Sequence, residues 1–370
     1  MLKFEKFKQM NDKIVIKIGT SVLADSSGKV DYSRMKKLVD DVAEIKNKGK
    51  DIMLVTSGAI GAGMAELDIK ERPRDVKMQQ ACAAIGQSVI MAKYKEFFSK
   101  HKINVAQILL SYDTFSDRKK FLNLRNSIQM ILKLGAVPII NENDPISIDE
   151  LGPSFGDNDK LSALVASKIE ADMLLMLTIV DGIYDKDPKY SDAKLIREIH
   201  QFDKNIENLK GKASKLGTGG IKTKVEAAKV AMSSGIITII ANGKKDLIKD
   251  IINGKKQGTV FYPGKKISSK KRWIRFSEAK GNIVVDEGAK RAMMNGKNLL
   301  PSGIVNVKGD FDKDDVIDIF CNNNPFAKII ADYGSDDLNE YKGKNSDEIK
   351  KLYNKKINNV ARRENLVFIE

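Results

Sequence analysis

Six apolar runs recur along the first 241 residues, and stretches with the periodicity of amphipathic helices separate them. The runs read IVIKI, IMLVT, VAQILL, VPII, MLLMLTIV and IITIIA. Short runs that are apolar at nearly every position are typical of strands buried on both faces, and their alternation with helices indicates βα units. The sequence therefore predicts an α/β fold, a three-layer α/β/α sandwich with a mostly parallel central sheet.

The alternation stops near Asn242, where the composition changes. Residues 244–280 contain glycines, a proline and clustered lysines, whereas residues 281–370 combine short predicted strands with turn signals and one helical segment. We expect a large α/β domain over residues 1–243, a basic linker over 244–280, and a small β-barrel-like domain with a C-terminal tail over 281–370.

The chain of 370 residues has a formal net charge of +15, which raises the question of nucleic-acid binding. The excess lies in residues 244–275, where 11 lysines and arginines face 2 aspartates and glutamates. Residues 281–370 hold 14 basic against 15 acidic side chains. Because phosphate backbones are bound through clustered basic side chains, we do not expect RNA as a partner of the C-terminal domain.

Histidine and cysteine are scarce. His101 and His200 lie outside any glycine-rich or carboxylate motif, which argues against a zinc centre or a serine–histidine triad, and we expect no metal ligands from the protein. Cys82 and Cys321 occur in unlike surroundings, as expected of free thiols in a reducing compartment. Without a long apolar run or an apolar N-terminal segment, a cytoplasmic protein with no membrane contact is expected.

Two segments have the chemistry of a phosphate site. Lys17 leaves a predicted strand just before Gly19, and Lys224 closes the segment GTGGIKTK at the predicted start of a helix. Backbone N–H groups and helix N-termini attract anions, and each lysine adds a mobile positive charge. Since a buried lysine is costly unless it meets an anion, the pair points to phosphoryl transfer.

Hydrogen-bonding side chains gather in the segments NEND and GDND, which supply Asn141, Asp144, Asp157, Asn158 and Asp159. Such residues are common in turns. Together with two lysines elsewhere they suit a site in which Asp159 orients the ammonium groups while Asp144 and Asn158 receive a substrate amine.

Ser57 lies in VTSGAIGAG, whose glycines let the backbone approach a ligand while the hydroxyl donates a hydrogen bond. The segment lacks the first glycine of a nucleophile elbow. The chain also contains neither the P-loop pattern G-x-x-x-x-G-K-[ST] nor the H-R-D and D-F-G triplets. These absences exclude the usual P-loop and protein-kinase interpretations.

The motifs, taken in order, closely resemble the amino acid kinase family, followed by a PUA domain (the pseudouridine synthase and archaeosine transglycosylase module). The match covers nearly the whole chain and reads VIKIGTSVL, VTSGAI, AAIGQ, QILLS, FLNLRN, VPIINEND, GDNDKLSAL, GTGGIKTK, KRW, VDEGAK, LLPSGI and GDF. The resemblance is to the family members that phosphorylate the γ-carboxylate of L-glutamate with ATP. It implies a kinase that makes γ-glutamyl phosphate and ADP, the first step from glutamate to proline.

The resemblance also implies residue roles. Lys17 and Lys224 would contact the ATP phosphates and stabilise transfer while Asp159 organises them, so these three are the predicted catalytic residues. The predicted glutamate site consists of Ser57, Asp144, Asn158, Asn141 and Asp157. The predicted nucleotide contacts, besides the two lysines, are Thr178, Ile179, Thr218, Gly219, Gly220, Ile221, Lys222 and Thr223.

Two positions depart from the family pattern. Thr178 and Ile179 stand where the family usually has Thr-Asp, and Asp181 follows two residues later. Lys222 places a second cation close to Lys224, where the family often has a small polar residue. Both departures concern the nucleotide contacts.

The resemblance further implies Mg²⁺ held largely by phosphates and water, proline as a feedback inhibitor, and a homo-oligomer. Two alternatives stay open. A sister enzyme acting on another carboxylate or on carbamate would share the fold and both lysines, whereas an RNA-binding protein would act through the PUA domain. The NEND and GDND segments, together with the tail domain, favour free glutamate.

Overall fold

In a computed structural model of the chain, the described residues are 12–25, 28–111, 113–146, 158–202, 206, 220–245, 248–255, 258–263, 268–354 and 359–369. The chain forms two compact units. Apart from residues 115–117, the first unit extends to Lys266 and the second begins at Ile267.

The first unit is built on an eight-stranded sheet in the order β3-β4-β2-β1-β5-β9-β10-β8. Neighbouring strands are parallel except β9 and β10, which are antiparallel. The mostly parallel sheet is thus confirmed, and the six predicted apolar runs form six of its strands. The strands are β1 (Lys13–Ile18), β2 (Asp51–Val55), β3 (Val105–Leu110), β4 (Val137–Glu142), β5 (Met173–Thr178), β8 (Glu198–Ile199), β9 (Ile237–Asn242) and β10 (Thr259–Phe261), while β6 (Ile183–Tyr184) and β7 (Leu195–Ile196) form a separate ribbon.

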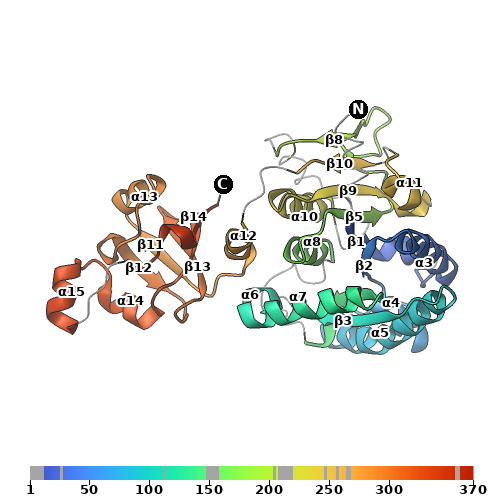
Figure 1. Ribbon diagram of the computed structural model, residues 1–370, viewed down its shortest axis with the longest axis horizontal. Helices are drawn as coiled ribbons and strands as arrows, with labels where there is room; N and C mark the ends of the chain where they lie inside the picture. Colours follow the sequence, from blue (N-terminus) through green and yellow to red (C-terminus); the bar gives the residue numbers. More distant parts are fainter. Residues whose placement is uncertain are drawn as a thin grey trace. The chain divides into compact units, whose positions relative to one another are not determined.

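Helices cover both faces of this sheet, which gives the three predicted layers (Figure 1). Helices α8 and α10 pack together on one face, and α3, α5 and α11 pack on the other. The helical elements are α2 (Thr20–Leu23), α3 (Tyr32–Asn47), α4 (Ala59–Glu66), α5 (Val76–Ser99), α6 (Asp113–Ser116), α7 (Arg118–Lys133), η1 (Asp144–Ile146), α8 (Asn158–Lys168), α10 (Ile221–Ser233), η4 (Gly243–Lys245) and α11 (Ile248–Ile252).

Strand β1 shows how the sheet admits a polar side chain. Successive side chains of a strand point to opposite faces. Ile14, Ile16 and Ile18 join the apolar core that α3 and α5 complete, whereas Lys17 meets Asp159 at the start of α8 on the other face. The strand therefore delivers a lysine to the α8 side without interrupting the core on the α3 side.

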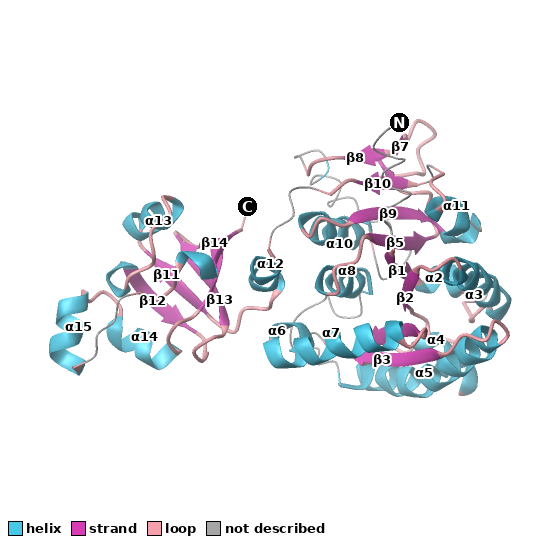
Figure 2. Cartoon of the chain, viewed as in Figure 1, coloured by secondary structure: helices cyan, strands magenta, loops and turns pink. Residues whose placement is uncertain are grey.

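The second unit has its own five-stranded sheet in the order β12-β11-β13-β14-β15, in which only β11 and β13 are parallel neighbours. Its strands, magenta in Figure 2, enclose an apolar core with short helices around them. This is the expected strand-rich domain. Its elements are α12 (Ser269–Phe276), β11 (Asn282–Val285), α13 (Glu287–Met294), η5 (Pro301–Gly303), β12 (Ile304–Lys308), β13 (Val316–Cys321), β14 (Asn324–Ile330), α14 (Ser335–Tyr341), α15 (Ser346–Tyr353), η6 (Arg363–Asn365) and β15 (Leu366–Phe368).

The segment 244–280, expected as a linker, contains regular structure that belongs to both units. Helix α11 adds to the core of the first unit, and β10 pairs with β9 in its sheet. Helix α12 packs on β14 and β15 of the second unit, where Trp273 and Ile274 join an apolar cluster with Val316 and Val367. The folded units therefore meet in the chain near Lys266, and many of the lysines sit on folded elements.

Two smaller expectations concern the membrane and the thiols. No helix in the described part of the chain is both long enough and apolar enough to cross a membrane. Cys82 and Cys321 are free and buried, as predicted.

Candidate active site

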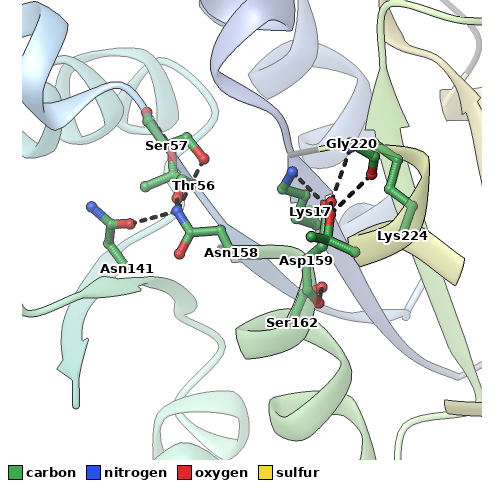
Figure 3. Close-up of polar contacts among 10 residues, drawn as sticks. Lys17, Thr56, Ser57, Asn141, Asn158, Asp159, Ser162, Gly220 and Lys224 are labelled. Atoms are coloured by element: carbon green, nitrogen blue, oxygen red, sulfur yellow. Dashed lines mark hydrogen bonds and ion pairs between the residues drawn. The ribbon is translucent and has the colours of Figure 1, made fainter. Parts of the chain in front are cut away.

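The carboxylate of Asp159 lies between two lysines beyond the carboxyl end of β1 (Figure 3). Lys17 Nζ is 2.6 Å from Oδ1 of Asp159, and Lys224 Nζ, from α10, is 3.0 Å from Oδ2. Asp159 is completely buried, and each lysine is only 6% exposed. One carboxylate thus holds ammonium groups from two separate elements of the fold.

The electrostatics of this cluster favour an anionic ligand. Burial opposes the charge of Asp159, but the neighbouring ammonium groups of Lys17 and Lys224 outweigh it and lower the pKa of Asp159 to about 2. The carboxylate is therefore ionised at neutral pH. Two ammonium groups and one carboxylate therefore meet at one buried position, an arrangement of charges that suits an anionic ligand.

The start of α10 adds N–H groups to this cluster. Gly220 is the N-cap residue in an extended conformation, and no described side chain caps the helix. Thr223 Oγ1 lies 3.0 Å from the Gly220 carbonyl oxygen and 3.1 Å from Oδ2 of Asp159. Uncapped N–H groups and the positive end of the helix dipole bind phosphate well. Lys224 lies one turn further along the helix, close to these N–H groups.

A second polar cluster surrounds Asn158 at the start of α8 (Figure 3). The Nδ2 atom of Asn158 lies 2.8 Å from the carbonyl oxygen of Thr56 and 3.0 Å from the hydroxyl oxygen of Ser57. The same atom is 3.0 Å from Oδ1 of Asn141 in β4. Asn141 Nδ2 in turn donates to Oε1 of Gln87 in α5, at 2.8 Å. The ends of β2 and β4 and two helices therefore converge on one chain of amide groups.

The turn between β2 and α4 holds Ser57 in place. Gly58, the N-cap of α4, has a φ of 98°, a left-handed conformation that favours glycine. On the other side of Ser57, the buried Thr56 hydroxyl is 2.8 Å from that of Tyr94 in α5. Ser57 is thereby fixed at the strand end with 6% of its surface exposed.

Asp144 opens the short helix η1 directly after β4 and is half-buried. Burial and the neighbouring Glu142 carboxylate raise the pKa of Asp144 to about 6. An ammonium group beside Asp144 would favour its ionised form. The residue is therefore electrostatically suited to a cationic ligand group.

At the end of β5, Thr178 is buried whereas Ile179 is 40% exposed. Asn242 Nδ2 donates to the carbonyl oxygen of Ile179 at 3.0 Å and lies 2.9 Å from Oδ1 of Asp181. Lys245 Nζ is 2.6 Å from the same oxygen. Hydrogen bonds from Lys245 and then Asn242 hold the pKa of Asp181 below its usual value. Asp181, which follows Thr178 and Ile179 by two residues, is thus bound by the side chains of Asn242 and Lys245.

The structure brings seven of the predicted site residues together in two clusters. The first contains Lys17, Asp159, Thr223 and Lys224, and the second contains Ser57, Asn141 and Asn158. The remaining described candidates lie nearby in the fold: Thr178 and Ile179 at the end of β5, Asp144 in η1, and Gly220, Ile221 and the exposed Lys222 at the start of α10. The predicted site residues outside the described part of the chain are Asp157, Thr218 and Gly219.

Sequence reasoning does not single out Gln87, although its side chain contacts Asn141. In the sequence, Gln87 is one polar residue in a helical run, and only the preceding Gly86 hints at close packing. The Thr56 carbonyl oxygen is equally hidden, because any residue supplies one. Contacts of this kind become visible only when distant elements are placed together.

Two buried lysines, a helix N-terminus and a separate cluster of amide and hydroxyl groups fit the transfer of a phosphoryl group to a small polar acceptor. The amino acid kinase family model matches residues 12–242, and the PUA domain model matches residues 281–353. The chain belongs to the amino acid kinase family.

Its relatives within the family are similar over almost their whole length. The glutamate 5-kinase of Thermoanaerobacter sp. (strain X514) is 44% identical over 366 residues, 97% of this chain and 98% of that protein. The glutamate 5-kinase of Methanococcoides burtonii is 43% identical over 360 residues, 96% of each chain. Both domains are therefore shared with these relatives.

A solved structure has the same fold. The carbamate kinase from Giardia lamblia bound to AMP-PNP aligns with a TM-score of 0.50 at 16% identity, covering 69% of this chain and 99% of that one. At this identity the likeness concerns the fold alone.

Proposed function

We propose that the protein transfers the γ-phosphoryl group of ATP to the γ-carboxylate of L-glutamate, forming γ-glutamyl phosphate and ADP. The observation that carries this proposal is the buried arrangement of Lys17 and Lys224 on Asp159. It occurs in a chain that is 44% identical to a glutamate 5-kinase over 97% of its length. The product would be the activated acid of the first step in proline biosynthesis.

Lys17 and Lys224 are assigned to the phosphates of ATP. During phosphoryl transfer, negative charge spreads over the oxygens of the transferring group, and fixed cations stabilise it. Asp159 is the positioning residue, because it holds one ammonium group on each carboxylate oxygen. The open N–H groups at the start of α10 supply further stabilisation.

The acceptor needs no general base. The γ-carboxylate of glutamate is ionised at neutral pH and is already a nucleophile, so the protein has only to orient it and to neutralise charge. This agrees with a described site that is built from lysines, amides and hydroxyl groups.

We assign the α-ammonium group of glutamate to Asp144, with Ser57, Asn141 and Asn158 around the rest of the substrate. Asp144 has the required sign of charge, and its raised pKa reflects burial and the Glu142 carboxylate, which outweigh the opposing effect of Arg72. Thr178, Ile179, Ile221, Lys222 and Thr223 are assigned to the nucleotide side, by their places at the end of β5 and the start of α10.

Mg²⁺ is proposed to enter with the nucleotide. The described residues hold no cluster of three or more histidine, cysteine, aspartate or glutamate side chains that would chelate a metal. Asp159 carries an ammonium group on each oxygen. Phosphate oxygens and water, which Mg²⁺ readily keeps as ligands, would therefore hold it, and its charge would add to that of the lysines.

A coupled ADP-release assay tests the function. L-Glutamate, L-aspartate and N-acetyl-L-glutamate are compared at equal concentrations with saturating Mg²⁺ and ATP. The proposal predicts turnover with glutamate and at least 100-fold lower kcat/KM, about 2.7 kcal/mol, for the other two acids. Comparable rates with N-acetyl-L-glutamate would show that the amine is not recognised and would overturn the assignment.

Three further assignments extend the proposal. Proline is proposed to inhibit by raising the apparent KM for glutamate, because it is the end product of the pathway. Our candidate for a residue that contacts both proline and glutamate is Glu150, which lies outside the described residues. A homo-oligomer is proposed and is tested by light scattering. A cytoplasmic location is supported by two free thiols.

A further inference from the structure

Gln87 is buried beside the proposed glutamate site, and the NH₂ group of its side-chain amide has no partner among the described residues. The residue is 8% exposed, and its Oε1 accepts a hydrogen bond from Asn141 Nδ2. Its Nε2 atom is buried without a hydrogen-bond partner in the described part of the chain. A buried donor without a partner is costly, so such a group calls for an explanation.

The orientation of the amides follows from one main-chain atom. The carbonyl oxygen of Thr56 only accepts hydrogen bonds, so Asn158 must turn Nδ2 towards it. The same Nδ2 faces Asn141, which must therefore present Oδ1 and turn its own Nδ2 to Gln87. Gln87 must therefore accept this hydrogen bond through Oε1. The free group of Gln87 is consequently an N–H donor rather than an acceptor.

The backbone around Gln87 is also closely packed. A Cβ atom on the neighbouring Gly86 would lie 1.9 Å from the carbonyl oxygen of Ala59 in α4, so only glycine allows this approach of α5 to α4. The helix that carries Gln87 is thus packed against the helix that follows Ser57. Gln87 is held in place by both the packing of its helix and its bond to Asn141.

The geometry points to Gln87 as the residue that recognises the α-carboxylate of the substrate through Nε2. The inference rests on the proposed function and names the side chain that binds the α-carboxylate of glutamate. The γ-carboxylate must face Lys17 and Lys224, so the acid bound at the amide chain is the α-carboxylate. The acceptor Oδ1 of Asn158, which also has no hydrogen-bond partner among the described residues, suits the adjacent α-ammonium group.

Two substitutions separate recognition from support. Gln87→Glu keeps an oxygen for Asn141 Nδ2 but replaces the free donor with a carboxyl group that repels the substrate acid. Gln87→Met keeps the shape and removes both polar functions. The matched control is Gln79→Met in the same helix, whose Nε2 donates to the carbonyl oxygen of Pro73 at 2.8 Å.

The measurements are the KM values for glutamate and ATP, and the ratio of Kd for the α-amide of glutamate to Kd for glutamate itself. For Gln87→Met we expect an increase of about 10- to 100-fold in glutamate KM, because a hydrogen bond to a charged group is lost, with ATP KM unchanged. The Kd ratio should fall by a similar factor, since only glutamate carries the acid. Gln79→Met should match the wild type.

Gln87→Glu provides a pH readout that a supporting role would not produce. Its defect in glutamate KM, relative to the wild type at each pH, should shrink as the pH falls, because the protonated carboxyl group regains a donor. It also keeps the bond to Asn141, so it tests the inference even if Gln87→Met fails to fold.

Equal losses of affinity for glutamate and its α-amide in Gln87→Met would overturn the inference, as would wild-type glutamate KM in Gln87→Glu at pH 8. Normal glutamate turnover by the wild type alongside such results would leave the proposed function intact. If the wild type does not phosphorylate glutamate at all, the proposed function fails and this inference fails with it.

Discussion

Lys17 Nζ and Asp159 Oδ1 lie 2.6 Å apart in a site where the aspartate has no exposed surface. Lys224 Nζ lies beside the other carboxylate oxygen, so the two lysines share one buried counter-charge. Removing one member of a buried ion pair leaves the other uncompensated. Stability and turnover should therefore both depend on Asp159.

Asp159→Asn should lose turnover and also lower the free energy of unfolding by about 3–5 kcal/mol, because two buried ammonium groups lose the carboxylate that they share. Urea denaturation and the ADP-release assay measure the two effects. The control is Asp250→Asn, since Asp250 forms a partly exposed pair with Lys255 and should matter by less than about 1 kcal/mol. A stable and active Asp159→Asn would contradict this account.

The same pair predicts an acid dependence of stability. The pKa of Asp159 is lowered from 3.8 to about 2, so its contribution is fully present above the unfolded pKa and is lost as the pH falls through the folded one. The difference in unfolding free energy between wild type and Asp159→Asn should shrink between about pH 4 and pH 2. A difference that is constant across this range would rule out ionised Asp159 as its source.

Lys224→Met should reduce kcat by about 100- to 1,000-fold, the usual effect of removing one electrostatic contact to a transition state. The fold should persist, because Lys17 still neutralises Asp159. Lys229→Met is the matched control: it removes the same charge from α10, but its Nζ lies 5.8 Å from the ring centroid of Phe202. Similar kcat values for the two variants would show that Lys224 does not stabilise the transferring phosphoryl group.

Asp144 should make glutamate binding depend on pH. Since burial and then Glu142 raise its pKa to about 6, Asp144 carries its charge above that pH and loses it below. The glutamate KM of the wild type should be flat above pH 7 and rise about tenfold per unit below pH 6, while ATP KM changes little. Asp144→Asn should bind glutamate weakly at every pH tested. Persistence of the rise in this variant would assign it to another group.

Truncation should leave a folded and active first unit only if the chain ends before α12. A chain ending at Lys266 keeps the β10 strand of the first sheet and should retain most of kcat. A chain ending at Lys280 also carries α12, whose buried Ile274 packs in the second unit, and should aggregate more readily. Circular dichroism, light scattering and kcat are compared for both. A folded but inactive chain ending at Lys266 would show that the second unit contributes to catalysis.

Much of the fold could be predicted because buried parallel strands leave short runs that are apolar at nearly every position. The motifs marked Lys17, Asp159 and Lys224 by their chemistry. Clustered lysines suggested a linker over residues 244–280, whereas Trp273 and Ile274 of α12 pack in an apolar cluster. Gln87 was missed for a different reason. Its role depends on a chain of amides that begins at the Thr56 carbonyl oxygen, and a main-chain atom has no signature in the sequence.

The most direct test of the central claim is to trap the product with hydroxylamine during turnover. An acyl phosphate on the side chain reacts to give γ-glutamyl hydroxamate, which mass spectrometry distinguishes from the α-isomer by its fragments. We expect the γ-hydroxamate in amounts that match ADP release, and about 100- to 1,000-fold slower formation of both products by Lys224→Met. Release of ADP without γ-hydroxamate, or with the α-isomer, would contradict phosphoryl transfer to the γ-carboxylate of glutamate.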